Sequence, residues 1–520
     1  MARWELVFEI DRTGRTSYVR QIAKGLTEEI QRGRLRPGDR LPGTRTLART
    51  LRVHRQTVVA AVEELIAEGW LITRRASGTF VAAGLPEVSS RKSVHAAAVH
   101  PRAAARFALV LAAAPVPELP RLVPSGTILM SGTRPDLRSL PADLIGRAYR
   151  RALRVGGPAL LSYRDPAGIP RLRQGLATML SATRGMATDP NAILVTRGSQ
   201  MALALTARAL LRPADAIVVE NPGYRPAWEA FRAAGAEVIP IPVDEHGLDV
   251  TALERLLTRR SIRALYVTPH HQFPTTVTLT GPRRTALLQL AARERFAVIE
   301  DDYDHEFHYR GRPVLPMASA DAEGVVVYIG TLSKVLAPGL RVGFVAAPRN
   351  LIERLVAHRS FIDLQGDPVL ESAIAELLDE GLIQRHVRRM RRVYQRRLEV
   401  LVAALRRQLG DFLRFRVPSG GTAIWVKTKD ARTMMRWLEA SRANGVAFDP
   451  PTEYSFTAVQ AAGARLGFAS LTEDELHLAV NGLAKAATRT RSRVTSSLRG
   501  LRKIASRSDH ALLRDPRFPR

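Results

Sequence analysis

Cysteine is absent from this sequence, and so are the features of secreted and membrane proteins. With no cysteine among 520 residues, a disulfide framework, a cysteine metal site and a thiol nucleophile are all excluded. The first ten residues lack the basic and apolar regions of a signal peptide, and no apolar run is long enough to span a bilayer. We therefore expect a soluble, cytoplasmic protein with no membrane partner.

Acidic residues are also scarce relative to basic ones. There are 78 Lys and Arg against 49 Asp and Glu, a net charge of +29. An arginine-rich proteome accounts for part of such an excess, but a strongly basic chain also favours polyanions, nucleic acid first. The stretch from Lys485 to Arg520 has eleven basic and two acidic residues. We interpret residues 486–520 as a basic, disordered tail.

The length and the changes in composition predict several parts. A chain of 520 residues is too long for one ordinary core. Residues 1–82 have the helical periodicity of a small compact unit, and residues 83–127, rich in Ala, Pro and Val, are typical of an interdomain linker. Residues 128–485 alternate short apolar runs with amphipathic stretches, which predicts an α/β domain with a mostly parallel sheet covered by helices. The expected strands are residues 192–196, 216–220, 237–243, 263–269, 296–301, 325–330 and 341–347.

The first unit has the pattern of a winged helix-turn-helix. Two short helical stretches, residues 44–53 and 54–69, are joined tightly and followed by a hairpin in which Gly78 permits the turn. In this motif the start of the second helix enters the major groove, where Arg can bind guanine and Gln can bind adenine. Arg45 would face the DNA backbone. The alternative is a small helical domain with ordinary surface arginines. The candidate groove residues are His54, Arg55, Gln56 and Thr57.

Residues 37–82 resemble the GntR-type winged helix almost from end to end. Members of that family typically have Pro-Ser-Ser-Arg where this chain has residues 42–45, and a Ser-Arg pair where it has His54 and Arg55. The resemblance implies a double-stranded DNA operator as partner, contacted by Arg45, Arg55 and Thr57. His54 replaces a serine that caps the second helix, and we expect it to be a poorer cap.

A single lysine between apolar stretches, in TLSKVLAPGLRVGF, points to different chemistry in the larger domain. Lys334 at a strand end, beside a phosphate-binding loop, suits a Schiff base with pyridoxal 5′-phosphate. A neighbouring cation such as Arg341 would lower the pKa of the lysine and grip the phosphate. Thr331 and Ser333 supply hydroxyl groups beside it.

The other needs of this cofactor are met elsewhere in the same domain. Ser199 and Gln200 begin a helix directly after a strand, and helix N-termini hold phosphates. Asp301 ends an apolar strand, where its carboxylate can hold a protonated pyridine nitrogen. Tyr303, two residues later, would point to the same side and can bond the phenolic oxygen. Tyr224 offers an aromatic face to the ring.

Each of these features has an ordinary alternative. A lone Ser-x-Lys is common, Tyr224 could belong to the core, and residues 301–304 (Asp-Asp-Tyr-Asp) could be a metal cluster or a solvated loop. Their order along one α/β chain favours the cofactor interpretation, and we assign no metal ligand.

That order resembles fold type I aminotransferases over roughly 350 residues, with large and small subdomains. SKVLAPGLRVGF, RGSQ, EDDYD and NPGY resemble their Schiff-base, phosphate, Asp-x-Tyr and ring-stacking segments. The resemblance implies that Tyr163 reaches the phosphate of a neighbouring subunit, hence a homodimer, expected to be domain-swapped. It also implies that Arg465 clamps a substrate or effector carboxylate. Gln272 stands where the family has an asparagine on the phenolic oxygen.

A GntR-type reader joined to an aminotransferase-like domain resembles the MocR family of bacterial regulators, from about residue 15 to 485. The resemblance implies a pyridoxal phosphate-dependent transcriptional regulator that senses an amine or amino acid through a Schiff base at Lys334. Two alternatives stay open. One is a working aminotransferase with an accessory DNA-binding domain, and the other is a sensor of pyridoxal phosphate itself. The complete set of cofactor residues leaves partial transaminase half-reactions open, and the fused DNA reader favours a regulator over an enzyme that turns over.

Overall fold

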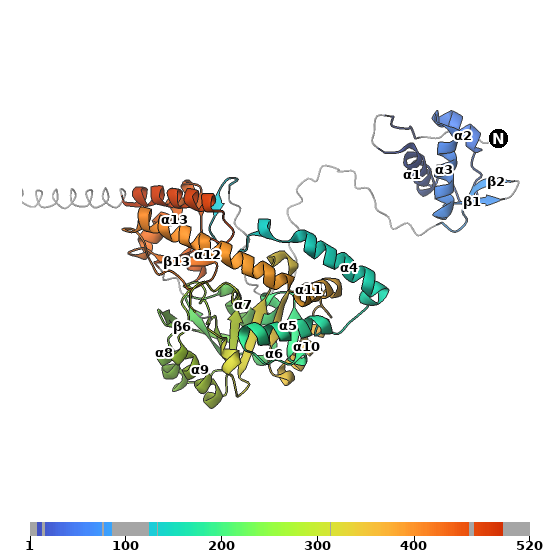
Figure 1. The fold of residues 1–520 in the computed structure, drawn as a ribbon. Coiled ribbons are helices and arrows are strands. Elements are labelled where there is room, and N and C mark those ends of the chain that lie inside the picture. The colour runs from blue at the N-terminus through green and yellow to red at the C-terminus, as the bar shows by residue number, and fades with distance from the viewer. Residues whose placement is uncertain are drawn as a thin grey trace, which may run out of the picture. The chain divides into compact units, whose positions relative to one another are not determined.

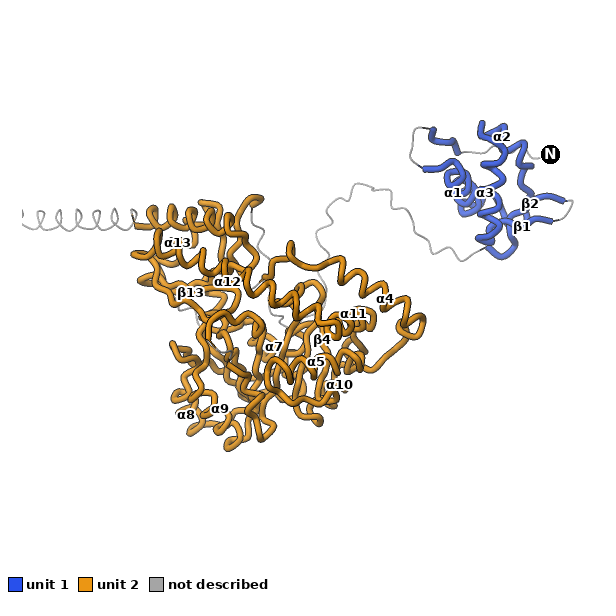
Figure 2. Tube along the Cα trace, viewed as in Figure 1, with its two compact units in different colours: residues 1–113 blue, residues 114–520 orange. Residues whose placement is uncertain are grey.

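The computed structural model divides the chain into two compact units, residues 1–113 and residues 114–520 (Figure 2). Most of the expected linker and tail lies outside the residues that the structure describes, as does Arg75 of the predicted hairpin. The described residues are 8–12, 16–74, 77–85, 124–132, 134–311, 314–456 and 462–491.

The first unit consists of three helices and a two-stranded hairpin. Its core is formed by one apolar face of each helix, including Leu26, Leu47, Val58 and Leu65, each at most 1% exposed. The hairpin pairs antiparallel, with Arg74 opposite Gly78. This is the winged helix-turn-helix arrangement predicted from the sequence. Its elements are α1 (Tyr18–Gln31), α2 (Thr44–Leu51), α3 (Arg55–Ala67), β1 (Leu71–Arg74) and β2 (Gly78–Val81).

The second unit is built on an eight-stranded, mostly parallel sheet with the strand order β4-β11-β10-β9-β8-β5-β6-β7. Pairing is parallel from β10 through β9, β8 and β5 to β6, and antiparallel at β11 and β7. All seven predicted strands are present. The strands are β4 (Ile193–Thr196), β5 (Ala216–Asn221), β6 (Glu237–Asp244), β7 (Gly247–Leu248), β8 (Ala264–Val267), β9 (Ala297–Asp302), β10 (Val326–Thr331) and β11 (Gly343–Ala346).

Helices cover both faces of this sheet (Figure 1). Because side chains alternate along a strand, Val219 packs in one apolar cluster with α6 and α7, while Val218 packs in another with α8 and α9. Burial on both faces explains the continuous apolar runs of these strands. The helices are α4 (Ala142–Leu160), α5 (Pro170–Arg184), α6 (Ser199–Leu210), α7 (Arg225–Ala233), α8 (Val250–Leu257), α9 (Gly281–Glu294), α10 (Arg349–Ser360) and α11 (Pro368–Asp379).

The 28-residue helix α12 (Leu382–Leu409) connects this large subdomain with a small one (Figure 1). Its first turns, with Val387, pack in the core of the large subdomain, and Leu398 and Leu405 pack in the small one. The small subdomain has an antiparallel sheet β12-β13-β15 and a parallel pair β3 and β14. Its elements are β3 (Ile128–Leu129), β12 (Arg414–Phe415), β13 (Ala423–Lys427), α13 (Ala431–Ala443), β14 (Val446–Ala447) and β15 (Gly463–Gly467).

The last described helix runs from residue 473 to residue 491, past the expected start of the tail at residue 486. Ala486 and Ala487 are buried in the core of the small subdomain, so the folded part extends beyond the predicted boundary. Across the described ranges, no helix is both long and apolar enough to cross a membrane.

Candidate functional site

The start of α3 presents the side chains predicted to contact DNA. Arg45, His54, Arg55 and Gln56 are exposed, and Thr57 is half-buried. The buried face of α3 packs against α1 and α2, so the exposed side at the helix start is available for a groove.

The side chain of His54 caps α3. Its ring Nδ1 accepts a hydrogen bond from the backbone N–H of Gln56, with an N–N distance of 3.3 Å. An imidazole nitrogen therefore replaces the hydroxyl oxygen that a serine would supply. Arg55 extends back toward α2, where its Nε lies 3.5 Å from Thr44 Oγ1.

The hairpin brings an arginine that the sequence analysis missed to the same unit's surface. Gly78 has φ +110°, a backbone conformation that other residues rarely adopt. A Cβ at this glycine would lie 3.1 Å from Nε of Arg40, which is exposed and forms a bridge with Phe80. Arg74 stacks over the Phe80 ring at 5.0 Å. Residue 40 pairs with a hairpin that is distant in the sequence, so no local motif predicts this contact.

In the second unit, the carboxyl ends of β4, β5, β8, β9 and β10 surround a cavity of about 150 Å³. Nine of the twelve residues predicted for the cofactor and effector site line it. These are Ser199, Gln200, Tyr224, Asp301, Tyr303, Thr331, Ser333, Lys334 and Arg341. Four further lining residues were not predicted from the sequence: Tyr266, Thr268, Phe273 and Pro338.

Lys334 follows β10 and lines the cavity. Burial lowers the pKa of its ammonium to about 8, and the positive charge of Arg465 acts in the same direction. The turn before it is fixed by Thr331, whose Oγ1 lies 3.0 Å from Ser333 Oγ and accepts a hydrogen bond from the Ser333 N–H. A lysine with this pKa is partly neutral, and therefore nucleophilic, near neutral pH.

The N-terminus of α6 and Arg341 together form a cradle for an anion. Gly198, with φ +80°, precedes the helix, whose first residues Ser199 and Gln200 face the cavity. A Cβ at Gly198 would lie 2.7 Å from the Arg341 guanidinium, so only glycine lets that group approach. Arg341 Nη2 donates to the carbonyl oxygen of Arg197 at 2.7 Å. Free helix N–H groups and a guanidinium are a suitable site for a phosphate.

Asp301 is a buried carboxylate with one oxygen left for a ligand. Its Oδ2 accepts a hydrogen bond from the Tyr266 hydroxyl at 2.8 Å, whereas its Oδ1 has no partner among the described residues. Burial raises the pKa of Asp301 to about 7. A buried, half-satisfied carboxylate is costly unless a cationic or N–H group completes it.

Three tyrosines, including Tyr266, and a phenylalanine form the aromatic part of the wall. Tyr224 packs edge-on against Phe273, with ring centroids 5.2 Å apart, and burial raises the pKa of its hydroxyl to about 12. The Tyr303 hydroxyl donates to the backbone oxygen of His271 at 2.7 Å. Because its proton is used there, the Tyr303 oxygen is left to accept hydrogen bonds from the cavity side.

Arg465, on β15, lies next to the cavity but is not part of its lining. It is 0% exposed, its guanidinium stacks over Phe273 at 5.0 Å, and it donates to the Pro274 carbonyl oxygen at 3.2 Å. Its Nη2 is 3.5 Å from the Tyr303 hydroxyl oxygen. Within the described part of the chain its hydrogen-bond partners are Pro274 and Tyr303, neither of them acidic, and its Nε has no partner. A buried guanidinium without a carboxylate is unusual and favours an anionic ligand.

Two predicted residues lie away from the cavity of their own chain. Gln272 is buried, but its amide donates to the carbonyl oxygens of Pro222 and Phe273 and accepts from Thr275. Its donors and acceptor are used by Pro222, Phe273 and Thr275, and its contact with a cofactor remains a prediction. Tyr163 is 81% exposed.

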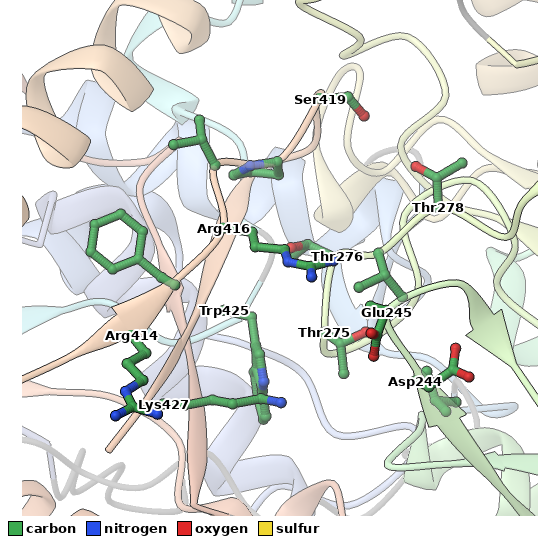
Figure 3. A pocket seen from close by; sticks show the side chains of 15 residues that line it. Asp244, Glu245, Thr275, Thr276, Thr278, Arg414, Arg416, Ser419, Trp425 and Lys427 are labelled. Carbon is green, nitrogen blue, oxygen red and sulfur yellow. The ribbon is translucent and has the colours of Figure 1, made fainter. Parts of the chain in front are cut away.

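A larger cavity, of about 460 Å³, lies between the two subdomains (Figure 3). Arg414, Arg416 and Lys427 come to it from the small subdomain, and Asp244 and Glu245 come from the end of β6. None of the predicted site residues lines it.

Comparison with known proteins agrees with both units. The model of the bacterial regulatory proteins of the gntR family matches residues 18–81, and that of aminotransferase class I and II matches residues 135–483. The probable rhizopine catabolism regulatory protein MocR of Rhizobium meliloti is 34% identical over 92% of this chain and 95% of its own length. An aromatic-amino-acid aminotransferase of Thermococcus litoralis is 30% identical over 73% of this chain and 92% of its own length.

Among solved structures, the α-aminoadipate aminotransferase LysN of Thermus thermophilus has a TM-score of 0.66 at 29% identity, covering 71% of this chain and 94% of that one. The two units therefore define a helix-turn-helix regulator fused to a domain with the fold of class I and II aminotransferases. The relative from Rhizobium meliloti aligns along both units. This chain belongs to the MocR family of transcriptional regulators.

Proposed function

We propose that this regulator binds pyridoxal 5′-phosphate and uses it to sense an amine that carries a carboxylate, such as an amino acid. The observation on which this depends is the single cavity that gathers Lys334, Asp301 and Arg341 at the strand ends. The sensing unit and a DNA reader are parts of one chain, so a change in the cavity can alter DNA binding if the two states differ in affinity.

The residues of the cavity fit this cofactor. The unpartnered Oδ1 of Asp301 suits a pyridine N–H, and the space that a Cβ at Gly198 would fill suits a phosphate between Arg341 and α6. Bound pyridoxal 5′-phosphate would supply an aldehyde that exchanges amines. Lys334 would hold the aldehyde carbon, Asp301 the ring nitrogen, and Tyr224 one side of the ring. The LysN structure was determined with a phosphopyridoxyl-leucine compound, which supports this fit by analogy.

Arg465 is the proposed partner of the effector carboxylate. It is buried beside Lys334, whose pKa it lowers, and the described residues give it no acidic partner. A planar guanidinium can bind a carboxylate with two parallel hydrogen bonds. An amine bound at the cavity would therefore be selected by a carboxylate on the side of Arg465.

We further propose that the regulator acts as a homodimer, as the resemblance to fold type I aminotransferases implies. A group of large apolar side chains is exposed in two neighbouring segments, which a hydrogen bond from the Arg164 backbone N–H to Gln365 Oε1 connects. Exposed apolar groups of this size mark interaction surfaces. A partner on this surface would bring Tyr163 to the other chain's cavity. The exposed residues are Val155, Leu161, Tyr163, Phe361, Ile362 and Leu364.

A spectroscopic titration tests the proposal. Purified protein loaded with pyridoxal 5′-phosphate should absorb in the visible, and a carboxylate-bearing amine should shift that band and change the affinity for an operator fragment. A band that no amine shifts, together with operator binding that depends on the cofactor alone, would favour sensing of pyridoxal phosphate itself.

A working aminotransferase is a second candidate, because the aromatic-amino-acid aminotransferase of Thermococcus litoralis covers most of the same unit. Sustained conversion of a keto acid acceptor by the purified chain would favour this candidate. Amine exchange without turnover would favour the regulator.

A further inference from the structure

A group of histidines lies next to the cofactor cavity without taking part in it. His270 and His271 follow β8, and His305 and His308 follow β9, so the parallel pairing of these two strands brings the two loops together. The rings are close: the centroids of His270 and His271 are 4.4 Å apart, and those of His270 and His308 are 5.9 Å apart.

The free nitrogen atoms of three of these rings converge. One ring nitrogen each from His270, His271 and His308 lies within 4.8 Å of the others. Neither ring nitrogen of His270 has a hydrogen-bond partner within the described residues, and neither does Nε2 of His271. His270 and His271 are 4% and 1% exposed. Three unpartnered imidazole nitrogens in so small a volume are unfavourable without a ligand.

A carboxylate fixes one of these rings in the manner of a metal site. Nδ1 of His271 is 2.8 Å from Asp304 Oδ1, and this bond leaves Nε2 as the ligand atom. Histidines that bind metals commonly use their second nitrogen in this way. His305 differs, because its Nδ1 pairs with Asp302 Oδ2 at 2.9 Å.

The group can be reached from solvent. His308 is partly exposed, and with His305 it lines a cavity of about 180 Å³ that also contacts Arg184, Glu306 and Arg391. An ion could enter by this route without passing through the cofactor cavity, which has a separate lining.

We propose that His270, His271 and His308 bind one first-row transition-metal ion, with Zn²⁺ as the probe. Three neutral imidazoles are a common ligand set for zinc and leave a fourth position for water or a small ligand. Bonds of about 2.0–2.1 Å would require the nitrogens to approach one another by small ring rotations. The inference goes beyond the proposed function and does not depend on it, since none of the three side chains lines the cofactor cavity.

Zinc binding to the full-length, untagged chain, loaded with pyridoxal phosphate and freed of metal by a chelator, tests the site. Zn²⁺ is titrated in competition with a chromophoric chelator, and bound metal is counted by elemental analysis. We expect one tight zinc per chain. His308→Gln, at a partly exposed position, should weaken the affinity by at least about 10-fold, since even an outer residue of a metal site is worth about 10- to 100-fold.

Two further variants separate the site from other effects. Asp304→Asn keeps the side-chain shape and removes the carboxylate that orients His271, so it should weaken zinc binding by about 10- to 100-fold. His477→Gln changes an exposed histidine on the last helix and should leave binding unchanged. All variants are loaded with the same amount of pyridoxal phosphate. Any zinc that the cofactor itself binds is therefore the same in each and does not contribute to the difference between variants. A wild-type chain without stoichiometric zinc, or equal affinity in His308→Gln and His477→Gln, would overturn the proposal.

Discussion

The winged helix and the cofactor cavity position their candidate residues in opposite ways. In the first unit, Arg55, Gln56 and their neighbours come from the start of one short helix and are exposed. In the second, nine side chains come from the ends of several strands and enclose a small volume. The first arrangement depends on about one helical turn, and the second depends on the register of the whole sheet.

This difference determines how strongly each residue should respond to substitution. An exposed arginine interacts through water, where salt screens its charge, and its loss removes one contact among many. A buried group such as Lys334 or Asp301 interacts at lower dielectric and changes the pKa of its neighbours. We therefore expect large, coupled effects in the cavity and modest, separable effects in the reader.

Lys334→Ala should have the largest effect. It removes the only proposed covalent tie to the cofactor, so the visible band should be lost entirely and the cofactor should leave on dialysis. Operator binding by the winged helix should persist. A borohydride-reducible adduct that survives in this variant would contradict the assignment of Lys334.

The pH dependence of cofactor capture should be the next largest effect. Only the neutral amine attacks an aldehyde, and the pKa of Lys334 is lowered to about 8. Protonation increases as the pH falls, so the capture rate should fall roughly tenfold per pH unit below pH 8 and level off above it. Stopped-flow absorbance measures this profile. A midpoint above pH 10, the ordinary range of a lysine, would show that the amine is not desolvated.

Arg465→Met should weaken the response to a carboxylate-bearing amine by about 10- to 100-fold, equivalent to about 1.5–3 kcal/mol for a charge-assisted pair. The same amine without its carboxylate is the internal control and should respond equally in both proteins. Removing this cation should also raise the pKa of Lys334 and move the capture profile to higher pH. Arg465→Lys keeps the charge, so it should preserve the pH profile of cofactor capture. It should still weaken the response to the amine, because a lysine cannot form two parallel hydrogen bonds with the carboxylate.

Arg55→Ala should have the smallest effect, about 1–2 kcal/mol or roughly 5- to 30-fold in operator affinity at fixed salt. The loss should be greatest for the preferred operator, and the cofactor spectrum should not change. Lys24→Ala on α1 is a control of the same charge. Equal effects of the two substitutions would mean that only overall charge matters.

Local pattern was enough to predict the elements that are periodic and long. The seven strands of the large sheet and the two reader helices were predicted because buried strands and amphipathic helices have distinct apolar periods. In the small subdomain, β12 has two residues, too few for a period, whereas β13 and β15 were not predicted although they have five residues each. The end of the folded part was also misplaced, since small apolar residues such as Ala486 and Ala487 resemble a solvated tail until something packs on them.

Residue chemistry by itself determined which side chains belong together in this protein: a lysine, a carboxylate, an arginine and a glycine turn that suit one cofactor. Only the tertiary structure decided which of them meet. Tyr266 was not predicted because its bond to Asp301 crosses between two strands. Gln272 has a suitable amide, but it bonds to Pro222 and Thr275. The hydrogen-bond partners and the burial of a residue are set by contacts between segments that are distant in the sequence. These contacts decide whether a residue of suitable chemistry is free to bind a ligand.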